Sequence, residues 1–219
     1  MDPQLLGLLI FLGSFLILLG ITELLYRRYK IPAEASRKFL HVSGGLLCLL
    51  LPTFFSSHWW VLVLALLSFL LLLTTYIKGM LQSVHKTKRY SVGSIIFPIS
   101  IYFCFLIAKR VDNNLLFFLP VSLLTISDAA AETAGKHWGY LSTQFFKGQK
   151  TLIGTIAFLL TAIIVCIGWM YYFNIPLQKI IVMTIILSLS ASIVELLTLR
   201  GWDNLTVPVI TVFILWLLI

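Results

Sequence analysis

The stretch TISDAAAETAGKHWGYLSTQFFKGQKTLIGT (residues 125–155) joins two long apolar runs, 115–131 and 152–173. It carries two carboxylates at the end of the first run and a short basic segment before the second. Either run is long enough to cross the roughly 30 Å hydrocarbon core of a bilayer as a helix. The stretch therefore predicts that the chain leaves the membrane here and re-enters it, with charged groups at the membrane edge.

The rest of the chain repeats this alternation of apolar runs and short polar segments. Of its 219 residues, 60% are hydrophobic and 11% are charged, and the mean hydropathy is +1.02, which is typical of membrane proteins. We expect spans at 4–26, 39–55, 58–77, 92–108, 115–131, 152–173, 178–199 and 204–219, the last being short. The fold class is thus an all-α integral membrane bundle of seven or eight helices, forming a single domain over 1–219 with no separate soluble part.

The basic residues predict how the bundle is oriented. The net charge is +8, which in a soluble protein would suggest nucleic acid as a partner. With eight spans, however, thirteen of the sixteen Lys and Arg residues fall in 27–38, 78–91, 132–151 and 200–203, all on one side. The positive-inside rule places these loops in the cytoplasm and both termini outside. We therefore expect a multi-pass protein of a bacterial or archaeal cell membrane, or of an ER-type membrane, with cytoplasmic chemistry and no nucleic-acid partner.

Asp128 and Glu132 are the first candidate site residues. They lie four apart, so they share a helix face, and adjacent carboxylates repel unless a cation or a proton lies between them. Mg²⁺ binds such carboxylates together with phosphate and water. The alternative for Glu132 is an ordinary pair with Lys136 at a helix end, just as Glu23 and the residue four further on, Arg27, predict a structural ion pair.

Small residues surround this pair. The spacing Ala131–Gly135–Gly139 allows close contact between helices. It also leaves room for a polar ligand to approach the backbone.

The segment KGQKTLIGT (147–155) favours phosphate binding. Lys147 and Lys150 supply charge, Thr151 precedes a helix start, and Gly154 and Thr155 fall in that helix's first turn. Helix N-termini bind anions through free N–H groups and the helix dipole. The pattern is not a Walker A loop, because glycine does not precede Lys150. An ordinary basic stop at the membrane edge explains it equally well.

Two further clusters lie on the same predicted side. SRKFLHVSGG (36–45) places Arg37 and His41 on one helix face. They could be parts of a site, or the basic residues could anchor the helix at the membrane edge and His41 could be an ordinary buried histidine. ELLTLRGWDNLTVP (195–208) contains Glu195, which could pair with Arg200 or a nearby lysine, and Asp203-Asn204, which could cap a helix. Together the clusters indicate a site for a metal-bound nucleotide and a lipid headgroup.

Five motifs carry a family resemblance. They are RKFLHVSGG, GSIIFPIS (93–100), SDAAAETAGKHWG, KTLIGT and DNLTVP, and they extend from about Arg37 to Pro208. With them the chain resembles the CTP-dependent lipid-alcohol kinases (phytol kinase, dolichol kinase and CTP-using diacylglycerol kinases), which are distantly similar to phosphatidate cytidylyltransferases. One departure is Ile153, where many relatives of phytol kinase have Glu in a Lys-Thr-x-Glu-Gly pattern, so another carboxylate must substitute or the substrate subgroup differs.

The resemblance implies transfer of the terminal phosphate of CTP to a long-chain lipid alcohol, with Mg²⁺ as cofactor and the bilayer as partner. The expected catalytic residues are Asp128, Lys150, Asp203 and His41. The expected metal ligands are Asp128, Glu132 and Asp203, although Asp203 could instead accept the alcohol's proton. The expected nucleotide or phosphate contacts are Arg37, Lys38, Lys136, Lys150, Thr151, Gly154, Thr155 and Asn204. The alternatives are a diacylglycerol kinase, a cytidylyltransferase-like enzyme, or a small cation- or proton-coupled transporter, which would carry its carboxylates near the bilayer midplane.

Overall fold

The computed structural model describes residues 2–86, 91–141, 143–145 and 150–219. Lys88, Arg89 and Lys147, which the sequence placed among the cytoplasmic cations, lie outside these ranges. In chain order the elements are α1 (Pro3–Arg28), α2 (Ala33–Cys48), α3 (Leu51–Phe54), α4 (His58–Ile77), α5 (Gln82–His85), α6 (Gly93–Val111), α7 (Leu115–Ser122), η1 (Leu123–Ser127), α8 (Asp128–Trp138), η2 (Gly139–Leu141), β1 (Gln144–Phe145), β2 (Lys150–Thr151), α9 (Leu152–Tyr172), α10 (Leu177–Leu197) and α11 (Asp203–Leu218).

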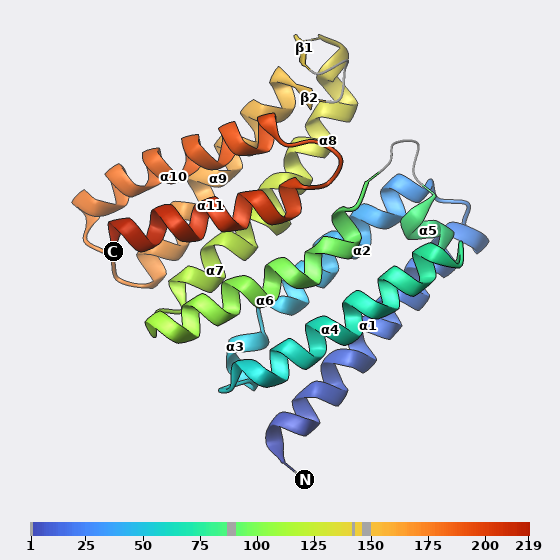
Figure 1. Ribbon diagram of the computed structural model, residues 1–219. Coiled ribbons are helices and arrows are strands. Elements are labelled where there is room, and N and C mark those ends of the chain that lie inside the picture. Colours follow the sequence, from blue (N-terminus) through green and yellow to red (C-terminus); the bar gives the residue numbers. More distant parts are fainter. Residues whose placement is uncertain (1, 87–90, 142, 146–149) are drawn as a thin grey trace.

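This architecture confirms the helical, multi-pass fold class. Among the described residues, six helices are long and apolar enough to cross a membrane: α1, α4, α6, the continuous helix Leu115–Trp138, α9 and α10. The predicted eighth span is α11, a shorter apolar helix of 16 residues. Figure 1 shows α9, α10 and α11 side by side at one flank and α1, α2 and α4 at the other, with α6 and α7 between them.

The predicted second span, 39–55, was wrong at both ends. Helix α2 begins at Ala33 and ends at Cys48, and a turn separates it from the short α3. Pro52 explains the break, because a proline lacks the N–H donor and its ring clashes with the carbonyl four residues earlier, here that of Cys48. Helix α2 therefore has 16 residues, and most of the residues in its first two turns are polar.

The predicted end of the fifth span, at residue 131, was also wrong. The helix continues to Trp138, because small residues and the Glu132–Lys136 ion pair support another two turns. Midway it contains the π-helical turn η1, in which the Asp128 N–H donates to the carbonyl of Leu123, five residues back. Such turns are rare and occur frequently at functional sites.

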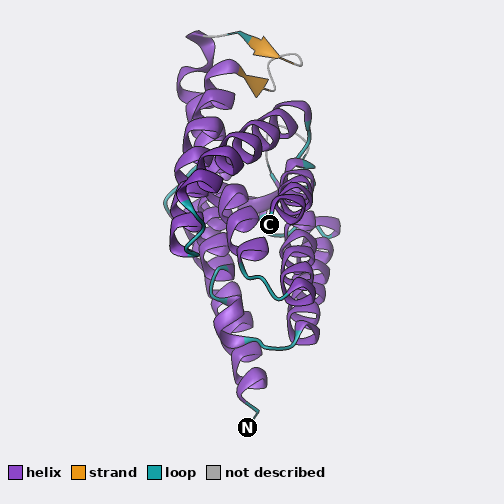
Figure 2. Cartoon of the chain, turned by 90° about the vertical axis from the view of Figure 1, so that its left-hand side faces the viewer, coloured by secondary structure: helices purple, strands orange, loops and turns teal. Residues whose placement is uncertain are grey.

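Several polar segments gather at one end of the bundle. The α1–α2 and α10–α11 connections, α5 and the β1–β2 pair lie toward this end, and both termini lie toward the other (Figure 1). Turned by 90°, the molecule is elongated, with the β1–β2 pair and the N-terminus at opposite extremes (Figure 2). The core between the ends is apolar and closely packed, with Phe55, Phe105, Phe117 and Phe158 fully buried.

Two charged pairs have plain structural explanations. Arg27 Nε lies 2.5 Å from Glu23 Oε1, as the spacing predicted. Lys109 and Arg110, which ran against the predicted charge asymmetry, lie in the last turn of α6. Cations are favoured there by the helix dipole, and Lys109 Nζ also lies 5.4 Å from the centre of the Phe105 ring.

Candidate active site

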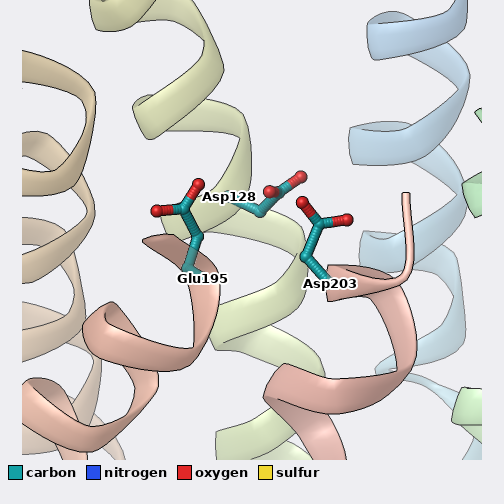
Figure 3. Close-up of side chains that lie close together, drawn as sticks. All are labelled: Asp128, Glu195 and Asp203. Carbon is teal, nitrogen blue, oxygen red and sulfur yellow. The ribbon is translucent and has the colours of Figure 1, made fainter. Parts of the chain in front are cut away.

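Three helices bring three carboxylates together. Asp128 directly follows the π-helical turn within the continuous helix Leu115–Trp138, Glu195 lies in the last turn of α10, and Asp203 begins α11. One carboxylate oxygen of each lies within 4.8 Å of the others. Figure 3 shows them converging from separate segments of the chain. We call Asp128, Glu195 and Asp203 the acidic triad.

Lys150 joins this triad from a fourth direction. Its ammonium contacts Glu195 Oε1 and lies 3.0 Å from Asp203 Oδ2. The antiparallel β1–β2 pairing and the Leu152 N–H, which donates to the Thr143 carbonyl at 3.0 Å, position the backbone around it. Burial by itself lowers the pKa of Lys150, but the carboxylates of Asp203 and Glu195, followed by that of Asp128, outweigh burial and hold this pKa above its ordinary value. Lys150 is therefore a permanent cation of the site.

The donor set of the triad fits a hard divalent cation. The exposed fractions of the three side chains are 18% or less. Within the described chain, the buried Glu195 Oε2 has no hydrogen-bond partner. A buried carboxylate oxygen left in this way is costly unless a ligand satisfies it. Three carboxylates and one ammonium also leave two formal negative charges, which a divalent ion such as Mg²⁺ balances.

His41 lies beside the triad on α2. Its Nε2 is 3.7 Å from Asp128 Oδ2 and 2.9 Å from the carbonyl oxygen of Leu124, in the π-helical turn. A carbonyl only accepts hydrogen bonds, so Nε2 carries the hydrogen and Nδ1 is the acceptor of the neutral ring. The π-helical turn thus helps to set both the position of Asp128 and the tautomer of His41.

Helix α2 packs unusually closely on that turn. A Cβ added at Gly45 would lie 2.6 Å from Thr125 Cγ2 and closer still to its Oγ1. A Cβ at the neighbouring Gly44 would meet nothing within 4 Å. Gly45 is therefore needed for close approach, whereas Gly44 borders empty space.

Glu132 lies in a cationic group and outside the acidic triad. Its Oε1 is 3.3 Å from Arg37 Nη2 and contacts Lys136, and its Oε2 is 3.8 Å from Lys38 Nζ. Lys136 also reaches Glu34 at 3.0 Å. The predicted pairing of Glu132 with Lys136 is present, and the carboxylate organises three cations at the rim of the site.

The start of α9 differs from the expected anion-binding turn. Thr151 directly precedes the helix, as predicted, and is its N-cap. The Thr151 hydroxyl accepts the Gly154 N–H at 3.1 Å, and the Leu152 N–H donates to the Thr143 carbonyl. These two N–H groups are therefore engaged within the protein. The Ala131–Gly135–Gly139 row packs against this turn, since a Cβ at Gly139 would lie 2.6 Å from Thr151 Cγ2.

The α10–α11 connection packs just as tightly on α6. Gly201 has a φ of +86°, which favours glycine, and a Cβ there would lie 2.8 Å from Gly93 Cα. The following residues, Asp203 and Asn204, are held at the site by this contact. Asp203 Oδ1 accepts the N–H of Asn204 at 3.1 Å, so its other oxygen faces Lys150.

One polar pocket of about 510 Å³ is lined by all twelve residues that were expected to be catalytic, metal-ligating or phosphate-binding. Its predicted members are Arg37, Lys38, His41, Asp128, Glu132, Lys136, Lys150, Thr151, Gly154, Thr155, Asp203 and Asn204. Glu195 also lines the pocket; the sequence placed it in one of the clusters that indicate the site, with an ion pair as the alternative, but it was not among the expected site residues. The available signal was an acidic residue inside an apolar span, which is costly and therefore a functional candidate.

Comparison with known proteins establishes the family. The cytidylyltransferase family matches residues 3–197, and the chain belongs to this family. This confirms the resemblance that the five motifs carry. The chain is also similar to phytol kinase from Synechocystis sp., with 27% identity over 222 residues that cover 98% of this chain and 94% of that protein. No solved structure matches the chain.

Proposed function

We propose that this protein transfers the terminal phosphate of CTP to the hydroxyl of a long-chain lipid alcohol, at the cytoplasmic face of the membrane. The observation that carries the proposal is the acidic triad with Lys150, in a polar pocket at one end of a membrane bundle. The similarity to phytol kinase over almost the whole chain supports the reaction type. Glu195 and Asp203 lie at helix ends, and Asp128, within the continuous helix Leu115–Trp138, meets them there. This position favours an interfacial enzyme over a transporter, whose acids would lie near the midplane.

In this proposal the triad holds the metal. Asp128, Glu195 and Asp203 are its carboxylate ligands, and Glu195 takes the place of the glutamate that Ile153 replaces in the family pattern. Bound Mg²⁺ would neutralise charge on the phosphate oxygens, which is the main requirement of phosphoryl transfer. Lys150 holds the triad together and contributes a fixed positive charge toward phosphate.

The cationic rim would bind the nucleotide. Arg37, Lys38 and Lys136 surround Glu132, which keeps their charges in place until phosphates enter the pocket. Because the N–H groups of Leu152 and Gly154 are engaged, side-chain cations supply most of the phosphate contacts.

The alcohol would react at the inner edge of the same pocket. Its oxygen forms a bond to the terminal phosphorus while the bond from that phosphorus to the leaving diphosphate breaks, releasing CDP. Asp203 would either ligate the metal or, as the alternative role, receive the hydroxyl proton, and the His41 imidazole orients the hydroxyl.

The decisive experiment uses CTP carrying the radiolabel in either the terminal or the innermost phosphate, with ATP as the comparison nucleotide. Purified protein in detergent is offered phytol, a polyprenol, dolichol, diacylglycerol and phosphatidate. Label from the terminal phosphate in the lipid of an alcohol supports the proposal. Label from the innermost phosphate in the lipid product would instead establish a cytidylyltransferase, the activity in the family's name. Transfer of neither label to any lipid contradicts both.

A further inference from the structure

A second cavity extends from the polar pocket into the bundle. It lies between α1, α2, α4 and α6, and apart from Arg37, His41, Ser68, Ser94 and Asn204 its lining side chains are apolar or small. Arg37, His41 and Asn204 line both cavities. We call this second cavity the apolar slot.

The lining of the slot changes character along a single face of α2. That face contains Arg37, His41, Gly44 and Cys48, spaced three or four residues apart, so they lie one above another. It is polar beside the triad and apolar further in. Cys48 lies seven residues beyond His41, roughly 10 Å along the helix axis. An amphiphile with a polar head and an apolar chain matches this sequence of surfaces.

The opposite wall is equally continuous. Helix α4 contributes Val61, Ala65, Ser68 and Leu72, which also recur at helical spacing. Val61 and Leu72 are buried, so this wall is part of the packed bundle and not its outer surface.

The slot is narrow. Its atom-free space, open mouth included, is about 870 Å³, but the centres of water molecules fit into only about 90 Å³ of it. The polar pocket offers about 510 Å³ by the same measure. Such a shape suits one thin hydrocarbon chain better than a compact ring system or two chains abreast.

We infer that the apolar slot binds the hydrocarbon chain of the substrate, and that the substrate is a single-chain lipid alcohol and not a two-chain diacylglycerol. This inference rests on the proposed function for the identity of the headgroup. The chain would lie along α2 and α4, which leaves its hydroxyl at the junction of the two cavities, beside His41 and Asn204. Burial of successive methylene groups in the slot would supply the affinity for long chains.

Gly44 offers a direct test, because it is buried yet a side chain there would enter empty space. Gly44→Leu should block the slot near its mouth. Gly168→Leu is the matched control: it also meets nothing within 4 Å, but it is exposed on α9 and lines neither cavity. We expect Gly44→Leu to lower kcat/KM for phytol by about tenfold or more, since several methylene contacts are lost, with KM for CTP unchanged. Gly168→Leu should match the wild type on both substrates.

A substitution further into the slot tests where the hydrocarbon chain of the substrate lies. Ala65→Leu should reduce phosphorylation of phytol more than that of the shorter geraniol, because only the longer chain reaches that depth. Equal losses for both alcohols, or equal behaviour of Gly44→Leu and Gly168→Leu, would overturn the inference. Wild-type preference for diacylglycerol over phytol would overturn the single-chain assignment.

A binding measurement separates this inference from the proposed function. A phytol analogue with a photoreactive diazirine at its tail should label peptides of α2 and α4, and excess phytol should compete. Labelling should fall in Gly44→Leu and persist in Gly168→Leu. If no alcohol is phosphorylated but this pattern holds, the proposed reaction fails and the slot assignment stands. If phosphorylation occurs but labelling lies elsewhere, the slot assignment fails alone.

Discussion

Lys150 Nζ lies 3.0 Å from Asp203 Oδ2 and also contacts Glu195, so one side chain of β2, just before α9, ties the end of α10 to the start of α11. Lys150→Ala would leave two largely buried carboxylates without their cation. Breaking a buried pair from one side costs about 3–5 kcal/mol, so the melting temperature in detergent should fall clearly. Added Mg²⁺ should restore part of the loss, because it supplies positive charge to the same carboxylates.

The same variant should also impair the reaction. Loss of a charge-assisted contact predicts about a 10- to 100-fold lower kcat/KM for nucleotide, with partial recovery in Lys150→Arg. Because the pKa of Lys150 is raised, its ion pairs are complete below the ordinary lysine pKa and are lost only as pH rises through the folded value. Deprotonation of Lys150 should therefore not lower the wild-type melting temperature between neutral pH and about pH 10. Lys147→Ala is the control, and equal, mild effects of the two alanine variants would contradict a special role for Lys150.

Asp128→Asn should abolish transfer while leaving the fold intact. The amide keeps the size of the side chain but removes the charge that a metal ligand needs. Several kcal/mol of charge stabilisation would be lost, so we expect at least about a 100-fold decrease in kcat at saturating Mg²⁺. Asp112→Asn, an exposed change at a left-handed residue near the other end of the bundle, should be silent. Activity of Asp128→Asn within a few-fold of wild type would remove Asp128 from the site.

Glu195→Gln and Glu132→Gln distinguish the triad from the cationic rim. Glu195→Gln should raise the Mg²⁺ concentration for half-maximal activity by about tenfold or more, since a triad ligand is neutralised. Glu132→Gln should change KM for CTP instead, because it releases Arg37, Lys38 and Lys136 from their shared partner. Mg²⁺ titrations and nucleotide kinetics of both variants test this. A reversed pattern would return Glu132 to the metal site that the sequence predicted.

The fold followed from the sequence wherever the apolar runs were uninterrupted. The runs 58–77, 152–173 and 178–199 became α4, α9 and α10 almost residue for residue, because a membrane helix must satisfy its own backbone. Two predicted spans had wrong boundaries for local reasons. Pro52 ended α2 early, and the Glu132–Lys136 pair carried the helix Leu115–Trp138 beyond its apolar part.

The sequence predicted which clusters of residues form the site, but not how their side chains are arranged in space. Counting spans places Asp128, Lys150 and Asp203 on one side of the membrane, which is why they could be grouped. Which carboxylates meet depends on how the helices pack, and the close contacts at Gly45 and Gly201 decide this. Glu195 therefore lies in the acidic triad and Glu132 lies at the cationic rim, although both are glutamates at the end of an apolar run.

The orientation of the bundle can be tested by chemical labelling. The distribution of basic residues predicts that the α8–α9 connection is cytoplasmic and the α6–α7 connection is outside. In a cysteine-free background, Thr143→Cys should react with a membrane-impermeant thiol reagent only in inverted vesicles, and Asn113→Cys only in intact cells. Reaction of both from the same side would refute the eight-span topology.

Gly44 and Gly45 are adjacent, but alanine at the two positions should have opposite effects on stability. At Gly44 a methyl group meets nothing within 4 Å, so Gly44→Ala should raise stability by about 0.5–1 kcal/mol through helix propensity alone. At Gly45 the methyl group would lie 2.6 Å from Thr125 Cγ2, so α2 must move away from the π-helical turn.

That displacement should cost about 1–3 kcal/mol, as overpacking does, and it should also withdraw His41 from Asp128. We expect a lower melting temperature and reduced kcat for Gly45→Ala. Thr125→Ala should partly rescue Gly45→Ala, because it removes both Oγ1 and Cγ2, the two atoms that the new methyl group would meet first, although it also loses the hydrogen bond that the Thr125 hydroxyl donates to the Val121 carbonyl at 2.7 Å. A double-mutant cycle on melting temperature measures this coupling. Additive effects of the two substitutions would show that α2 does not rest on the π-helical turn through Gly45.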